Sequence, residues 1–98
     1  MAQDAVQVAP HVYKVLFENE RVRVLEVRMK PGESSAMHSH PAYVIYGLGG
    51  GKVRFSSPSG ESAEVDVTAG DVMWRDPEEH AVDNIGTTDA HALLFELK

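Results

Sequence analysis

The chain has 98 residues, a formal net charge of −6 and no cysteine. This length allows one domain with one modest hydrophobic core, and the lack of cysteine excludes disulfides and thiolate metal sites. The nine basic residues are scattered among fifteen acidic ones, which argues against a nucleic-acid partner, and no apolar run approaches the roughly 18 residues of a membrane span. The N-terminus lacks the basic and then apolar order of a signal peptide, so we expect a cytoplasmic protein.

Short β-strands are predicted along most of the chain. Residues 1–10 are polar and alanine-rich and end at Pro10, which predicts a flexible arm before a single domain at residues 11–98. Runs rich in β-branched residues follow, with Gly, Pro, Asn and Asp between them, and the run Tyr43–Tyr46 fits a strand buried on both faces. No apolar period of 3.6 residues is sustained, so the sequence predicts an all-β sandwich or small barrel. Its exposed strand edges favour a homodimer, with the N-terminal strand as the natural one to pair or exchange.

His38 and His40 are separated by one residue. In a β-strand such residues lie on one face with their Cα atoms roughly 6.5 Å apart, which allows two imidazoles to bind one metal ion at about 2.1 Å. Two histidines spaced in this way, with no further motif, more often lie in a solvated loop or are hydrogen-bonded to the backbone. His80 begins another strand-like run and is the candidate third ligand, whereas His91 is predicted to be structural.

Two glycine-framed segments carry a family resemblance. Gly32, the His38–His40 pair and Gly51 resemble the first motif of the cupin superfamily, and Gly70–Asp71, Pro77, His80 and Asn84 resemble the second. The resemblance covers the chain from about Glu18 onward and implies a cupin-type double-stranded β-helix, or jelly-roll barrel. The runs 18–24 and 95–98 narrow it to the small single-domain cupins that include the beta-alanine degradation protein group, which implies small-molecule metabolism.

The chain departs from the cupin motifs at two places. Val44 occupies the position where the first motif usually has a glutamate ligand, and counting by twos from His38 and His40 predicts that it still faces the site. The expected site is therefore three histidines without a protein carboxylate. The loop before His80 is one residue short, which leaves the roles of Glu78 and Glu79 open; either is a candidate weak fourth ligand.

Three neutral imidazoles suit Fe, Ni, Zn, Mn or Cu and leave coordination positions for water and substrate. The sequence therefore predicts a metal-dependent enzyme of dioxygenase or lyase/isomerase type acting on a small polar metabolite. The alternative is a module that binds or senses a metal or small ligand without catalysis. Arg75 precedes the His80 loop and is the candidate for holding a carboxylate of the small-molecule ligand, although a surface salt bridge is an equal alternative.

Overall fold

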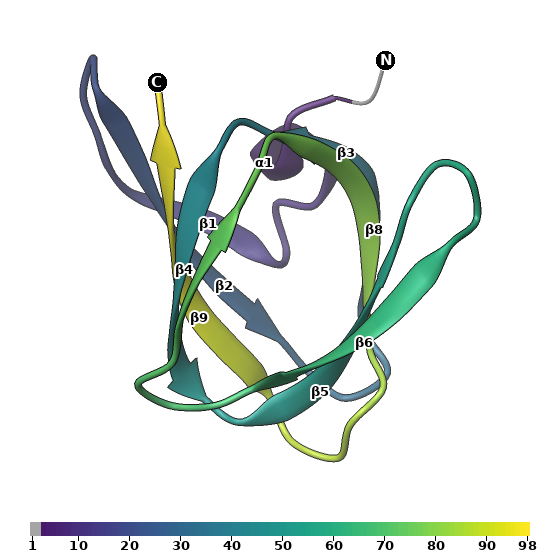
Figure 1. Cartoon of the computed structure of the whole chain (residues 1–98). Coiled ribbons are helices and arrows are strands. Elements are labelled where there is room, and N and C mark those ends of the chain that lie inside the picture. Colours follow the sequence, from purple (N-terminus) through teal and green to yellow (C-terminus); the bar gives the residue numbers. More distant parts are fainter. Residues whose placement is uncertain (1–2) are drawn as a thin grey trace.

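Two antiparallel β-sheets face each other and form a small barrel (Figure 1). The computed structural model describes residues 3–98. One sheet has five strands in the order β1-β2-β9-β4-β7, and the other has four in the order β3-β8-β5-β6. The strand bounds are β1 Tyr13–Glu18, β2 Val22–Met29, β3 Ser34–His40, β4 Tyr43–Gly49, β5 Gly51–Ser56, β6 Ser62–Val67, β7 Val72–Arg75, β8 Glu78–Asn84 and β9 Ala90–Leu97. The predicted all-β jelly-roll architecture is confirmed.

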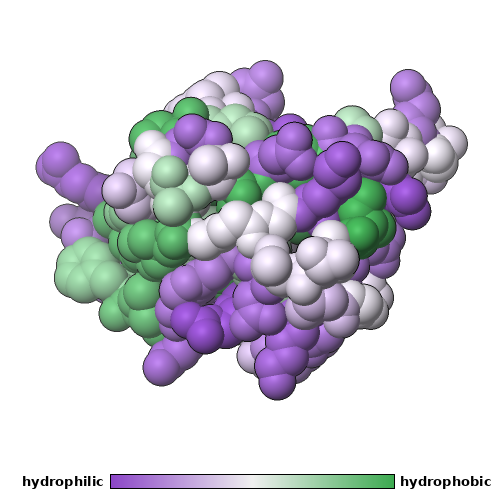
Figure 2. Space-filling model, turned by 90° about the horizontal axis from the view of Figure 1, so that it is seen from below, coloured by the Kyte–Doolittle hydropathy of each residue, from purple (hydrophilic) through white to green (hydrophobic). Residues whose placement is uncertain are grey.

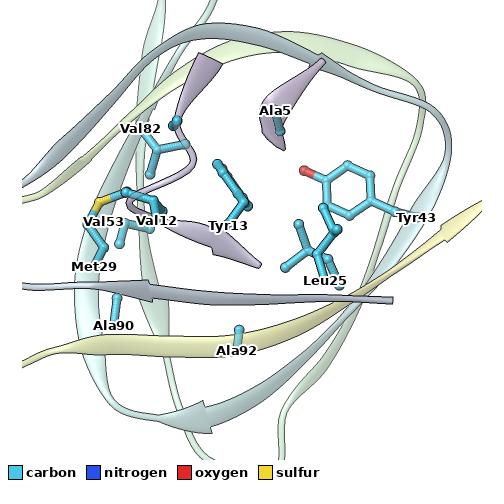
Figure 3. Packing of buried hydrophobic residues seen from close by; sticks show 12 residues of the cluster. Ala5, Val12, Tyr13, Leu25, Met29, Tyr43, Val53, Val82, Ala90 and Ala92 are labelled. Carbon is cyan, nitrogen blue, oxygen red and sulfur yellow. The ribbon is translucent and has the colours of Figure 1, made fainter. Parts of the chain in front are cut away.

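The core lies between the two sheets (Figure 3). Leu25 and Met29 of β2 point inward from one sheet, and Val53 and Val82 approach from the other. On β9 the inward positions begin with Ala90 and Ala92, whose side chains are too short to fill the space between the sheets. An apolar cavity of about 60 Å³ therefore remains inside the barrel.

Residues 3–10 do not form the predicted flexible arm. Ala5–Val8 form a short helix, α1, which begins at Asp4, whose carboxylate accepts a hydrogen bond from the Val6 N–H at 3.1 Å. The helix lies at the top of the barrel in Figure 1, beside β1 and β3. Ala5 and Ala9 are fully buried because a methyl side chain allows the helix to approach the barrel closely. Residues 1 and 2 of the predicted arm lie outside the described residues.

No helix within residues 3–98 has the length and hydrophobicity needed to cross a bilayer.

Candidate metal centre

Strands β3 and β8 bring the three predicted histidines together. His38 and His40 point inward from β3, and His80 on β8 is paired directly with His38. The ring centroids are 4.8 Å apart for His38–His40 and His38–His80, and 5.1 Å apart for His40–His80. All three side chains are buried, and one nitrogen from each lies within 4.8 Å of the others. The cluster could hold a metal ion.

A β-bulge in β3 sets this alignment. Ser35 pairs with Val82 and His38 pairs with His80, so β3 has one more residue than β8 between the two pairs. Without the extra residue, Met37 would lie opposite His80. The bulge turns His38 and His40 to the inner face, where Ser35 also lies. It also frees the Ala36 carbonyl, which accepts a hydrogen bond from His38 Nδ1 at 2.7 Å.

The tautomer of His38 follows from its partners. A carbonyl oxygen only accepts, so Nδ1 carries the proton and Nε2 carries the lone pair. The Tyr13 hydroxyl donates to that Nε2 at 3.0 Å, so this hydrogen bond would have to be given up when His38 binds a metal ion. Burial lowers the pKa of His38 and keeps the ring neutral, which a metal ligand requires.

A chain of charged side chains, of which Glu96 is buried, orients His40. The Nδ1 of His40 donates to Oε2 of Glu96 at 2.6 Å, and Oε1 of Glu96 accepts from Nε of Arg23 at 2.7 Å. The guanidinium of Arg23 also binds the Asp4 carboxylate with two nitrogens, which connects the beginning of α1 to the cluster. Because Nδ1 of His40 carries the proton, Nε2 carries the lone pair, and within residues 3–98 this buried atom has no hydrogen-bond partner.

Both ring nitrogens of His80 are buried and lack a hydrogen-bond partner in the described part of the chain. Burial lowers the pKa of His80 to about 3, so the ring is neutral at pH 7. A buried polar atom without a partner costs about 1–3 kcal/mol, and His40 and His80 together present three. A metal ion bound to the lone pairs of these rings would remove part of that cost, so the donor set fits a divalent transition metal.

Solved structures of several bacterial and archaeal proteins resemble this fold. A cupin domain from Bordetella pertussis Tohama I superposes with a TM-score of 0.80 and 29% sequence identity, over 100% of this chain and 97% of that one. A Klebsiella pneumoniae protein with a double-stranded β-helix domain superposes with a TM-score of 0.72 and 20% identity, over 88% and 75%. A cupin family protein from Methanocaldococcus jannaschii superposes with a TM-score of 0.70 and 14% identity, over 88% of this chain and 78% of that one. No protein-family model and no curated protein matches the sequence. This protein is a small cupin.

In this cupin Glu78 lies beside the histidine cluster, whereas Glu79 is exposed. Oε1 of Glu78 lies 3.5 Å from Nδ1 of His80, and Oε2 accepts a hydrogen bond from the Tyr43 hydroxyl at 2.6 Å. Burial opposes the charge of Glu78, but hydrogen bonds from Arg75 and Tyr43 outweigh it and lower the pKa of Glu78 to about 2. The carboxylate is therefore ionised, and of the two acids left open by the sequence it is Glu78 that bends inward.

Val44 does not face the histidines, and its predicted place in the site is wrong. Tyr43 and Ile45 line the inner cavity, while Val44 pairs with Trp74 and Phe95 on the opposite face of the sheet. The count by twos fails because β3 and β4 belong to different sheets. The chain turns between them at residues 41–42, so the alternation does not continue from His40 into β4.

Arg75 forms a two-point ion pair with Glu78, through Nε at 2.8 Å and Nη2 at 2.6 Å. Its guanidinium also lies 4.7 Å from the ring centre of Phe55, which in turn stacks on His80. These residues border a surface cleft of about 300 Å³ that also includes Ser56 and Ser57. Of the histidines in the cluster, His80 borders both this cleft and the inner cavity. That Arg75 holds a carboxylate ligand stays a prediction.

Tyr13 and Glu96 belong to the site but are not among the residues predicted from the sequence. Glu96 has a detectable signal, because it shares the inward parity of Ala92 and Leu94 and is a charged residue in an otherwise apolar series. A carboxylate at such a position requires a buried partner. Tyr13 has no such signal, since a tyrosine in a strand is typical of any half-buried sheet.

Proposed function

We propose that this cupin binds one divalent transition-metal ion, Fe, Ni, Zn, Mn or Cu, through His38, His40 and His80. The observation that carries the proposal is the set of buried ring nitrogens of His40 and His80 that have no hydrogen-bond partner within residues 3–98. Glu96 supports it, because a carboxylate on the far nitrogen of a ligating histidine fixes the tautomer and raises the basicity of the ring.

We further propose that the metal centre is the active site of an enzyme of dioxygenase or lyase/isomerase type that acts on a small polar metabolite. A metal ion with open positions polarises a carbonyl, lowers the pKa of bound water or, as Fe(II), binds dioxygen. The polar cleft beside His80 supports a polar substrate, because Ser56 and Ser57 offer hydroxyl groups and Arg75 and Glu78 offer charges there. The apolar walls of the inner cavity would exclude water from the other side of the cluster. The expected resemblance of the runs 18–24 and 95–98 to the cupins that include the beta-alanine degradation group would fit a role in small-molecule metabolism.

One observation favours the alternative, a module that binds a metal or small ligand without catalysis. The inner cavity next to His40 and His80 measures only about 60 Å³, and the described residues that line it include no carboxylate. The candidates for a general acid or base are then Tyr13, Tyr43 and His91 in the cavity lining and Glu78 on the cleft side.

Two experiments test these proposals in turn. Metal content of protein purified without an affinity tag is measured for the wild type, His80→Ala and the matched control His91→Ala, whose histidine lies outside the cluster. We expect His80→Ala to lose the metal and His91→Ala to keep it; equal metal content in the two variants would refute the ligand set.

The second experiment tests for an enzyme, with small carboxylates, amino acids and thiols as candidate substrates. It measures oxygen consumption by the Fe(II)-loaded protein, and loss of substrate with the protein loaded with Zn, Mn, Ni or Cu. Turnover that His80→Ala abolishes supports the enzyme, and silence across this panel supports the binding module.

A further inference from the structure

The hydroxyl group of Ser35 is buried and has no hydrogen-bond partner within residues 3–98. Of the four such side-chain atoms in this part of the chain, three belong to the rings of His40 and His80, and the fourth is Oγ of Ser35. Ser35 is 1% exposed and lies on the inner face of β3, as His38 does. A buried hydroxyl without a partner destabilises a fold, and the three proposed metal ligands leave this one unexplained.

The neighbour of this hydroxyl is the phenol of Tyr13. Burial raises the pKa of Tyr13, and the nearby Ser35 hydroxyl acts in the opposite direction. Tyr13 begins β1, is 4% exposed and projects into the interior of the barrel (Figure 3). Its ring lies edge-on to the rings of His38 and His40, with centroids 5.2 and 5.7 Å away. Tyr13 and Ser35 thus form a pair of hydroxyl groups beside the histidine cluster.

A metal ion on His38 would displace the Tyr13 hydroxyl, which donates to Nε2 of His38 at 3.0 Å. A ligating imidazole nitrogen lies about 2.0–2.1 Å from its metal, so an ion on the same lone pair would lie only about 1 Å from the phenolic oxygen. The oxygen must therefore shift. It cannot shift far, because the ring is buried and β1 is paired along its length with β2. The hydroxyl would remain beside the ion, and its proton would need a new acceptor.

We propose that Tyr13 donates a hydrogen bond to the ligand at an open position of the metal ion, and that the Ser35 hydroxyl positions Tyr13 for this. The inference rests on the proposed metal site and adds two residues to it. A phenol donates and accepts at once, so Ser35 can donate to the phenolic oxygen while the phenolic proton points to the ligand. Both hydroxyls are then satisfied. The ligand must offer an oxygen or nitrogen lone pair, as a carboxylate or another small anion does.

Tyr43 also lines the inner cavity, but its hydroxyl is already used. It donates to the Glu78 carboxylate at 2.6 Å, and this carboxylate is ionised. A hydrogen bond to a charged acceptor is stronger than one to a neutral nitrogen, so the Tyr43 hydroxyl stays with Glu78. Tyr13, in contrast, is bound to the nitrogen of His38 that the metal ion would take. Tyr13 is therefore the tyrosine that metal binding sets free.

The test is azide binding to the Co(II)-loaded full chain, followed by the visible absorption of cobalt. Azide is a small anion that occupies an open position and accepts hydrogen bonds. We expect Tyr13→Phe to bind azide at least about 10-fold more weakly, which is the loss of one hydrogen bond to a charged ligand. Its affinity for Co(II) should not fall, because the hydrogen bond between Tyr13 and His38 no longer competes with the metal.

Tyr46→Phe is the matched control, because it removes the same hydroxyl from the other side of the five-stranded sheet. Tyr46 is exposed and pairs with Val72, away from the cavity. Exposed hydrophobic residues gather at the left of Figure 2, the side on which this sheet lies in Figure 1. Tyr46→Phe should bind azide as the wild type does.

Ser35→Ala tests the positioning role and serves if Tyr13→Phe fails to fold. It should weaken azide about 2–10-fold in the wild type and should have no effect when Tyr13→Phe is already present, whereas a role in packing alone would weaken both backgrounds alike. Undiminished azide affinity of either single variant, or a wild type that binds Co(II) but no azide, would overturn the inference and leave the metal site standing. Loss of Co(II) from Tyr13→Phe would make Tyr13 a ligand and would also overturn it. A wild type that binds no Co(II) would overturn the proposed function itself.

Discussion

Glu96 is a buried carboxylate that accepts a hydrogen bond from His40 Nδ1 and so orients this ring. Replacing it with glutamine keeps the shape but removes the charge that supports the ring and neutralises Arg23. We expect Glu96→Gln to bind Zn²⁺ about 10–100-fold more weakly, as is usual when the carboxylate behind a ligating histidine is lost. Calorimetric titration measures this, with Glu64→Gln on the exposed pair with Arg54 as the control. Equal affinities of the two variants would contradict this role of Glu96.

The neutral state of His80 predicts a pH dependence of stability. In the unfolded chain His80 takes up a proton near pH 6.5, but burial lowers its pKa to about 3 in the folded protein. Between these values the unfolded state binds more protons, so the free energy of unfolding falls as the pH drops below 6.5, by at most about 1.4 kcal/mol per pH unit. Urea denaturation of the metal-free protein at pH 7.5 and 5.0 measures the fall. It should be smaller in His80→Gln, and an unchanged fall would show that His80 is not responsible.

Single residues of the site differ in how well the sequence predicts them. The three histidines are predictable because their spacing and their glycine frames specify both the strand and its inner face. Val44 is mispredicted because alternation holds only within one strand, and the turn at residues 41–42 moves the chain from one sheet to the other. The Tyr13 contact with His38 depends on two strands that are not paired with each other, which no local pattern encodes.

Among the elements, α1 is a helix that local sequence patterns do not predict. Four residues are too few to form a stable helix alone, so its existence depends on burial of Ala5 and Ala9 and on the Asp4–Arg23 ion pair. The strands are predictable from β-branched residues and turns, because these patterns are local. The bulge in β3 is not, although it decides that His38 and His80 meet.

Strand β4 passes close to the turn before β7 at Gly47. The Gly47 N–H donates to the Asp71 carbonyl and its own carbonyl accepts from the Gly70 N–H, both at 2.9 Å, and a Cβ here would overlap the Thr68 carbonyl. We expect Gly47→Ala to lower the free energy of unfolding by about 1–3 kcal/mol, because the turn must move. Gly49→Ala is the control, since its Cβ would meet only His91 Cβ at an ordinary 3.5 Å. Denaturant unfolding compares them, and equal stabilities would refute the steric account.

In the whole molecule, the five-stranded sheet forms one wall of the barrel and has an inner and an outer face. Its inner face lines the cavity beside the histidines, and its outer face carries Val44, which pairs with Phe95 and Trp74. The sequence predicts that Tyr43–Tyr46 is buried on both faces, but Tyr46 is exposed in the single chain.

X-ray absorption spectroscopy of the Zn²⁺-loaded protein can show whether imidazoles from β3 and β8 bind one metal ion. We expect three imidazole nitrogens at about 2.0–2.1 Å from zinc in the wild type, and two in His80→Ala. A spectrum of the wild type with oxygen ligands alone, or with an imidazole count that His80→Ala leaves unchanged, would contradict this expectation.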